Sequence, residues 1–345
     1  MKSYQMKKIV IIGAGSMASA FCFPCVDNGN TTYLVGTHLE NDFISKIQEN
    51  KFHPALNINL PNNLIIEKHD KLNEVLNSAD IIVAGISSVG INWFTEQIST
   101  HYKKNLPIIL LTKGLSVFEN KILTLSEKIK KNLRNFSSDE INISAVKGPC
   151  LASGLANKMR TGAVLANENI NIAKDLSSLI ATDYYSIEIT SDINGVELSG
   201  AIKNIYSMLI GASKGLSNLE ASDDIKDKYY LNTAASLVHR SVSEMSKFIE
   251  ANNGSISTVY GLAGLGDLYV SAIGGRNSLM GKYLGDGYLY LEAKEKFMKN
   301  ITVEGAELAK EIGPFILKNY SKKDFPLMFN VIESICNNKK LQIDW

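Results

Sequence analysis

The segment Gly13-Ala14-Gly15-Ser16-Met17-Ala18 has the spacing G-x-G-x-x-A, which can bind the pyrophosphate of a dinucleotide. It follows a β-branched run at 7–12 and opens an apolar stretch of helical length, which is the context such a fingerprint requires. An ordinary glycine turn could carry the same letters. The N-terminus of the following helix would offer free N–H groups and partial positive charge to an anion. The context therefore predicts a nucleotide site at Gly13, Gly15, Ser16, Met17 and Ala18.

The residues after the second expected strand, 31–35, bear on the choice between NAD and NADP. In NAD fingerprints an acidic residue there binds the ribose 2′-OH, whereas an arginine accommodates the 2′-phosphate of NADP. This strand ends in Val35-Gly36-Thr37-His38, which contains neither. We expect Thr37 and His38 to contact the ribose, and the sequence leaves NAD or NADP open as the cofactor.

Two lysines occupy positions where a cation could do chemistry. Lys113 follows the apolar run 108–111, so its ammonium group should emerge at the carboxyl edge of a sheet, where such folds bind ligands. Lys203 lies in a mostly apolar helical pattern that looks buried, and burial disfavours the charged form of a lysine. The alternatives are a solvated lysine at 113 and, at 203, a lysine that extends its ammonium group into water.

Two glycine-rich segments further along the chain carry polar side chains. Residues 261–268 form a glycine-spaced loop that presents Asp267 in apolar surroundings, and Arg276 and Asn277 follow two glycines. A guanidinium group offers a planar fork of donors and an amide offers another, which suits an oxyanion. Either segment could also be a plain turn.

The elements that must position these residues change in type near residue 190. Before it, apolar runs rich in Ile and Val alternate with helical stretches, which is typical of a parallel sheet covered on both faces. The expected strands are 7–12, 31–35, 81–86, 108–111, 143–146, 163–166 and 184–189, and the expected helices are 17–28, 71–77, 91–100 and 119–133. After it, helical patterns dominate at 194–216, 226–251, 305–312 and 326–336. We therefore expect the α/β class, with a Rossmann-type doubly wound parallel sheet that binds the dinucleotide over 1–190 and an all-helical domain over 191–345.

Composition excludes several classes of partner. The chain has 345 residues with 36 Lys and Arg against 35 Asp and Glu, so its net charge of +1 provides no field for nucleic acid or an anionic membrane. Four cysteines cannot form a disulfide framework in a chain of this length. No segment reaches the roughly 18 uninterrupted apolar residues of a membrane span. We expect a soluble, cytoplasmic protein without membrane insertion or nucleic-acid partner; a homodimer is compatible with the sequence, which does not settle the oligomeric state.

Cys22 and Cys25 form a C-x-x-C pair, which is typical of redox sites when it opens a helix. Here the pair falls well inside the helix expected after the glycine loop, so we expect both side chains to pack against the sheet. No histidine pairs with another His or Cys at ligand spacing, and no metal site is expected.

Taken in order, the motifs resemble the NAD(P)-dependent sn-glycerol-3-phosphate dehydrogenase family over nearly the whole chain. The matching segments are G-x-G-x-x-A at 13–18, Thr112-Lys113-Gly114, Gly148-Pro149, Gly195-Val196-Glu197-Leu198 with Lys203-Asn204, Gly264-Leu265-Gly266-Asp267-Leu268, Gly275-Arg276-Asn277 and Val303-Glu304-Gly305. The resemblance implies that Lys203 is the catalytic lysine and that Lys113 and Asp267 complete the polar site of a helical substrate-binding and catalytic domain. It further implies a substrate-binding set of Asn204, Ser271, Arg276 and Asn277, the last three at the phosphate, with Glu304 near the cofactor.

The chain departs from the family pattern at two places. Cys150 follows Gly148-Pro149 where a serine is usual, with Gly154 where a glutamate is usual, and the region 36–60, including His53, also differs. The expected reaction is reversible hydride transfer between NAD(P)H and dihydroxyacetone phosphate, giving sn-glycerol 3-phosphate, with Lys203 as general acid and base. Two alternatives stay open: a dehydrogenase of another phosphorylated or carboxylated hydroxy compound on this scaffold, or an NAD(H)-sensing redox regulator without turnover.

Overall fold

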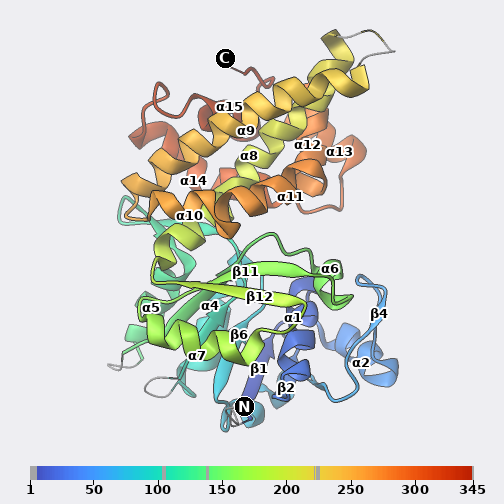
Figure 1. Ribbon diagram of the computed structural model, residues 1–345, viewed down its shortest axis with the longest axis vertical. Coiled ribbons are helices and arrows are strands. Elements are labelled where there is room, and N and C mark those ends of the chain that lie inside the picture. The colour runs from blue at the N-terminus through green and yellow to red at the C-terminus, as the bar shows by residue number, and fades with distance from the viewer. Residues whose placement is uncertain (1–5, 103–105, 137–139, 221, 223–225, 344–345) are drawn as a thin grey trace. The chain divides into compact units, whose positions relative to one another are not determined.

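The computed structural model describes residues 6–102, 106–136, 140–220, 222 and 226–343 (Figure 1). The chain divides into two compact units, the first made by Met1–Lys113 with Leu125–Ile193 and the second by Gly114–Thr124 with Asn194–Trp345. Within the part of the chain that the structure describes, no helix is both long enough and apolar enough to cross a membrane.

An eight-stranded sheet forms the centre of the first unit, with the strand order β12-β11-β10-β7-β6-β1-β2-β5. The strands are β1 (Lys8–Ile12), β2 (Thr31–Val35), β5 (Ile65–Glu67), β6 (Ile81–Ala84), β7 (Ile108–Leu110), β10 (Ile143–Lys147), β11 (Thr161–Ala166) and β12 (Tyr185–Thr190). All neighbours are parallel except β10 and β11, which are antiparallel. The predicted fold class is confirmed, but the sheet is mostly rather than wholly parallel. An apolar run indicates that a strand is buried on both faces and says nothing about its direction.

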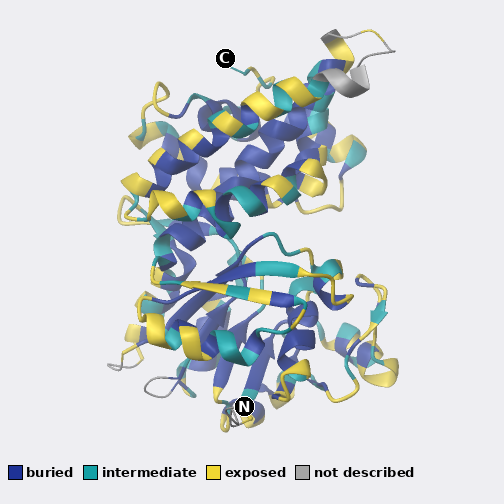
Figure 2. Cartoon of the chain, in the orientation of Figure 1, coloured by how far each residue is buried: buried dark blue, intermediate teal, exposed yellow. Residues whose placement is uncertain are grey.

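Alternate residues of the central strands enter two separate apolar clusters, so both faces of the sheet are covered. On one face, Ile9 and Ile11 pack with residues of α1 (Ser16–Asp27), α2 (Asn41–Asn50), α6 (Ala152–Ala156) and α7 (Ile170–Ile180). On the other, Val10 and Ile12 pack with α3 (Leu72–Leu76), α4 (Ile91–Ser99) and α5 (Leu125–Arg134). Figure 2 shows the central strands buried and β12 partly exposed.

The sheet has its topological switch point at β1. From β1 the chain passes to β2 and β5 on one side, and then to β6, β7 and β10 on the other. Sheets of this kind bind ligands at the carboxyl ends of the strands beside such a point. The glycine-rich segment directly after β1 therefore lies where a dinucleotide site is expected.

Most of the second unit is helical. Its helices are α8 (Ile193–Glu220), α9 (Lys226–Ala251), α10 (Ile256–Tyr260), a π-helical turn η3 (Leu262–Gly266), α11 (Asp267–Ile273), α12 (Arg276–Gly285), α13 (Tyr290–Phe297), α14 (Glu304–Asn319) and α15 (Pro326–Cys336). The segment 261–268 was expected to be a loop, and this expectation is wrong from residue 262 onward. Gly264 serves close packing there, because a Cβ on it would lie 2.1 Å from the carbonyl oxygen of Val259.

A hairpin of β8 (Leu115–Phe118) and β9 (Lys121–Thr124) belongs to the helical unit. This segment was expected in the first domain, with a helix from residue 119, and both expectations are wrong. Glu119 and Asn120 have φ values of 47° and 58°, which a tight hairpin turn requires and an α-helix excludes. The helix α5 begins at Leu125, and the buried Leu115 packs in the core of the second unit.

A second short hairpin, β3 (Phe52–His53) with β4 (Ile58–Asn59), lies between α2 and β5 in the first unit. Two 3₁₀ turns, η1 (His69–Lys71) and η2 (Ser88–Gly90), follow β5 and β6. None of these short elements, nor β5 itself, was expected from the sequence.

Candidate active site

The glycine-rich loop fits a bound pyrophosphate. Gly13 has a φ of +100°, and a Cβ there would lie 2.8 Å from the carbonyl oxygen of Gly85. A Cβ on Gly15 would meet no atom of the described residues within 4 Å, so the backbone is open to a ligand at that point. Ala18 packs tightly on the end of β6, because a Cβ on Gly85 would lie 2.4 Å from that of Ala18. Gly13 thus makes the turn, Ala18 packs against the end of β6, and Gly15 leaves space beside the backbone, as a pyrophosphate site requires.

His38 belongs to an aromatic cluster at the same edge of the sheet. Its ring centroid lies 5.2 Å from that of Trp93 and 6.0 Å from that of His69. His69 follows β5 and Trp93 lies on α4, which follows β6, so three strand ends contribute to the cluster. Sequence reasoning singled out His38 alone, although His69 could have been found if β5 had been recognised.

Glu40, at the start of α2, was missed by the sequence analysis. Both of its carboxylate oxygens accept a hydrogen bond from the backbone N–H of Ala14, each at 3.2 Å, and Oε2 also accepts one from Thr37 N–H at 2.8 Å. Glu40 lies beyond the end of β2 but roughly 20 residues after the fingerprint, where an acidic residue is expected. That spacing was the signal that could have found it.

His53 of β3 contacts the carbonyl group of the same residue, Ala14. Its Nε2 lies 3.4 Å from the carbonyl oxygen of Ala14, and its Nδ1 accepts a hydrogen bond from Leu56 N–H at 3.2 Å. Nδ1 is therefore unprotonated, and Nε2 carries the proton toward Ala14. Burial lowers the pKa of His53, against smaller raising effects of backbone hydrogen bonds. The region 36–60, which departs from the family pattern, thus positions the glycine-rich loop through both Glu40 and His53.

This arrangement predicts a pH dependence of stability. Because the pKa of folded His53 lies below its usual value of about 6.5, the unfolded chain takes up a proton at this residue first as the pH falls. The free energy of unfolding should therefore decrease from about pH 6.5 downward, by at most about 1.4 kcal/mol at pH 5.5. Chemical denaturation of wild type and His53→Gln at pH 7.5 and 5.5 measures this contribution. The exposed His239→Gln should keep the wild-type difference, and an equal difference in His53→Gln would contradict the assignment.

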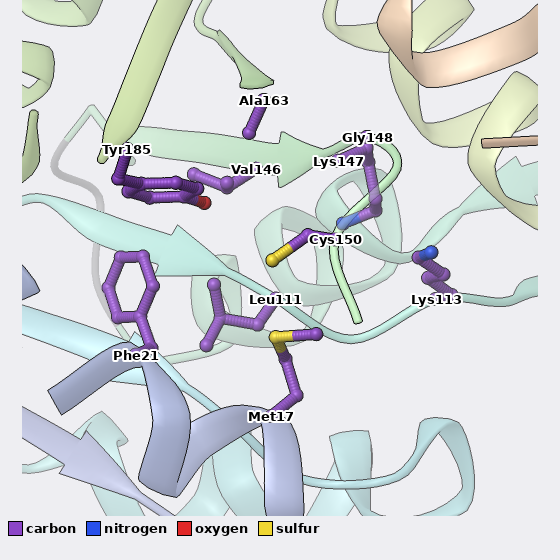
Figure 3. Close-up of a pocket in the computed structure, with 10 residues that line it drawn as sticks. All are labelled: Met17, Phe21, Leu111, Lys113, Val146, Lys147, Gly148, Cys150, Ala163 and Tyr185. Atoms are coloured by element: carbon purple, nitrogen blue, oxygen red, sulfur yellow. The ribbon is translucent and has the colours of Figure 1, made fainter. Parts of the chain in front are cut away.

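A pocket lies at the carboxyl ends of β7 and β10, beside the first turns of α1 (Figure 3). Figure 3 shows Phe21 and Tyr185 on one side of it and Lys113 and Lys147 on the other. Lys147 is buried, and its Nζ donates to the carbonyl oxygen of Leu110 at 3.0 Å. Lys113 lies just after β7, at the carboxyl edge of the sheet, where the sequence placed it. Lys147 was not singled out, although it too ends an apolar strand.

Lys203 and Asp267 form a buried ion pair in the helical unit. Lys203 Nζ lies 2.8 Å from Asp267 Oδ1, and the two side chains are 5% and 4% exposed. Lys203 also donates to the hydroxyl of Ser271, one turn after Asp267 on α11. The interpretation in which Lys203 extends into water is therefore wrong.

The remaining predicted residues of the helical unit, three for the substrate and Glu304 for the cofactor side, form two groups of contacts. Asn277 Nδ2 donates to Asn204 Oδ1 at 2.9 Å, and Asn277 Oδ1 accepts from Gly305 N–H at 2.9 Å. Arg276 Nη2 lies 2.9 Å from Glu304 Oε1, and about half of each side chain is exposed. The structure thus joins α8, α12 and the start of α14 through the amides, and leaves the guanidinium group of Arg276 accessible.

Both cysteines of the C-x-x-C pair are free and fully buried within α1. Burial raises the pKa of Cys22 and that of Cys25, which opposes formation of a reactive thiolate. This observation supports the packing interpretation and gives no support to a redox regulator.

The cysteine pair yields a simple expected result. Cys22→Ala with Cys25→Ala should lower the melting temperature through lost packing and leave the response of activity to dithiothreitol unchanged. Activity assays with and without oxidant, on wild type and the double variant, check this. If oxidation inactivates wild type and spares the double variant, the packing interpretation is wrong.

A doubly wound sheet with a G-x-G-x-x-A loop at its switch point is typical of the NAD(P)-binding class of proteins, to which most dehydrogenases of this fold belong. Family models narrow this class. The model described as the NAD-dependent glycerol-3-phosphate dehydrogenase N-terminus matches residues 8–173, and the corresponding C-terminus matches residues 192–343. The chain belongs to this family and is an NAD(P)-dependent glycerol-3-phosphate dehydrogenase.

Individual relatives agree with this assignment. The chain is 32% identical over 311 residues to the NADP(+)-dependent glycerol-3-phosphate dehydrogenase of Archaeoglobus fulgidus, covering 88% of each chain. It is 30% identical over 309 residues to a glycerol-3-phosphate dehydrogenase [NAD(P)+] of Clostridium botulinum, covering 88% of this chain and 86% of the relative. The crystal structure of the Coxiella burnetii glycerol-3-phosphate dehydrogenase shares the fold, with a TM-score of 0.82 and 24% identity over 98% of this chain and 97% of the other.

Proposed function

We propose that this enzyme transfers hydride reversibly between NAD(P)H and dihydroxyacetone phosphate, forming sn-glycerol 3-phosphate, with Lys203 as general acid and base. The buried contact of Lys203 with Asp267 and Ser271 is the observation that carries the proposal. A lysine is rarely placed in a core without a purpose, because desolvation disfavours its charged form.

The glycine-rich loop and the first turn of α1 would hold the pyrophosphate of the cofactor. Gly15 leaves the backbone open there, and Ser16 and Met17 begin the helix whose N–H groups face an anion. Thr37 and His38 would lie at the ribose. The bound nicotinamide supplies or accepts the hydride.

Lys203 would supply the proton in the direction of reduction. Negative charge grows on the carbonyl oxygen of the substrate as its carbon is reduced, and a positioned ammonium group stabilises that charge and donates the proton. In the oxidation direction the neutral amine takes the proton from the hydroxyl group. Asp267 and Ser271 fix the position of Lys203 Nζ, and Lys113 would complete the polar site.

Arg276, Ser271 and Asn277 would bind the substrate phosphate, and Asn204 would contact the substrate beside them. A guanidinium group has five N–H donors, so Arg276 can keep its contact with Glu304 and still bind a phosphate with other N–H groups. Asn277 ties Asn204 to the start of α14 and so fixes the backbone next to Arg276.

Oxidation of NADH and NADPH by dihydroxyacetone phosphate tests the proposal directly. We expect turnover with this ketone that exceeds turnover with a panel of 2-keto and 3-keto acids. A carboxylated substrate that is turned over faster would replace the proposal by the alternative of another hydroxy compound on the same scaffold.

A further inference from the structure

The carboxylate of Glu40 contacts the glycine-rich loop. Glu40 itself lies five residues after the end of β2, just before α2, whereas the acidic residue of an NAD fingerprint is usually found at the end of that strand. It accepts from Ala14 N–H between the two glycines of the fingerprint and from Thr37 N–H just after β2. The side chain is partly exposed. It therefore joins the glycine-rich loop to the turn after β2, the two segments between which the adenosine ribose of a dinucleotide lies.

This carboxylate has acceptor capacity left for a ligand. An ionised carboxylate offers about four lone-pair sites. Among the described residues, Ala14 and Thr37 donate to Glu40, and none of the ion pairs between described residues neutralises it. A neutral hydroxyl donor can use the remaining capacity, whereas a phosphate dianion would meet a negative charge.

From this geometry we propose that Glu40 receives the 2′-hydroxyl of the adenosine ribose and makes the enzyme prefer NAD(H) to NADP(H). The inference rests on the proposed function, in which the dinucleotide binds at the glycine-rich loop. The turn Gly36-Thr37-His38-Leu39 supplies no Lys or Arg that could offset the charge of Glu40 beside a 2′-phosphate. Like charges brought together at a binding site strongly disfavour the wrong ligand.

The segment after β5 lies at the same edge of the sheet and carries Lys68, His69 and Lys71. Lys71 is paired with Glu74 at 3.1 Å, and His69 Nε2 lies 3.0 Å from the amide oxygen of Gln97. His38 contacts His69 and Trp93 through its ring. If His38 or Lys68 instead recruits a 2′-phosphate, NADPH will bind at least as well as NADH, which contradicts the inference.

The experiment is an equilibrium titration of NADH and NADPH, followed by cofactor fluorescence, on wild type, Glu40→Gln and Asp42→Asn. Wild type should bind NADH at least roughly 100-fold more tightly than NADPH. Glu40→Gln keeps an acceptor oxygen for the backbone and removes the charge, so NADPH affinity should rise roughly tenfold and NADH affinity should fall roughly tenfold. Asp42→Asn removes one exposed negative charge two residues away and should leave the ratio of the two affinities unchanged.

The affinity ratio separates specificity from a merely structural effect. If Glu40 only stiffens the loop, Glu40→Gln weakens both cofactors equally, the ratio stays at its wild-type value, and the inference is overturned. An equal shift of the affinity ratio in Asp42→Asn also overturns the inference, because the overall negative potential of this surface, and not Glu40 itself, would then set the preference. Wild type that binds neither cofactor would instead overturn the proposed function, and with it this inference.

Discussion

Replacing Lys203 with alanine should lower kcat for the reduction of dihydroxyacetone phosphate by roughly 10² to 10⁴ fold. The ammonium group is held 2.8 Å from Asp267 and in contact with Ser271, so its loss removes both the proton donor and the charge that stabilises the developing oxyanion. NADH binding should be unchanged, because the residues proposed to hold the pyrophosphate and the ribose lie in the other unit. Stopped-flow turnover and NADH titration on the same preparation measure the two effects separately.

The buried ion pair complicates this variant in a predictable way. Removing one partner of a buried pair typically costs about 3 to 5 kcal/mol, because the other charge is left without compensation. Lys203→Ala should therefore be markedly less stable than wild type. Lys203→Met combined with Asp267→Asn removes both charges and keeps the apolar stem, so it should recover most of this stability without recovering turnover.

The neighbouring Lys214 supplies a matched control for Lys203. It lies on the same helix, α8, where its ammonium group contacts the ring of Tyr230. Lys214→Ala should keep kcat within about twofold of wild type, because Lys214 has no contact with the proposed catalytic group. Folded Lys203→Ala with near-wild-type kcat would show that the proton donor is another residue.

Local sequence patterns were sufficient to predict the strands and the helix around the glycine-rich loop. The strand Thr31–Val35 was predicted with the bounds that the structure has, β1 begins one residue later than predicted, and α1 begins and ends one residue earlier than predicted. Their apolar runs are continuous and end at glycines, so the burial pattern and the turn residues indicate the same element boundaries. The alternation of apolar runs with helical stretches also predicted the parallel arrangement of the central strands.

Contacts between distant segments could not be predicted from such patterns. Glu40 and His53 both reach the Ala14 peptide, from 26 and 39 residues further along the chain. Lys203 and Asp267 were each singled out, but their pairing across 64 residues follows from how α11 packs on α8 and not from either local motif. The hairpin turn at Glu119 and Asn120 was missed because glutamate rarely adopts a positive φ.

Selectivity for the phosphorylated substrate is the other effect that we expect to be large. Unphosphorylated dihydroxyacetone would leave the guanidinium group of Arg276 without its anion, and a site built for a polar group rejects an analogue that lacks it. Wild type should therefore use dihydroxyacetone phosphate with a kcat/KM roughly 10³ fold higher or more. Both kcat and affinity should contribute, since binding energy at the phosphate helps to orient the reacting carbonyl.

Variants of α12 assign this selectivity to a single side chain. Arg276→Ala should erase most of the preference for the phosphorylated ketone, and Arg276→Lys should restore only part of it, because an ammonium group lacks the bidentate fork. Lys282→Ala is the control on the same helix, since it removes a cation that is paired with Asp286 at 2.7 Å much as Arg276 is paired with Glu304 at 2.9 Å. Steady-state kinetics on both ketones decide the assignment. Equal selectivity in wild type and Arg276→Ala would place the phosphate at other residues, whereas a loss confined to Arg276→Ala would show that this guanidinium group binds it despite its contact with Glu304.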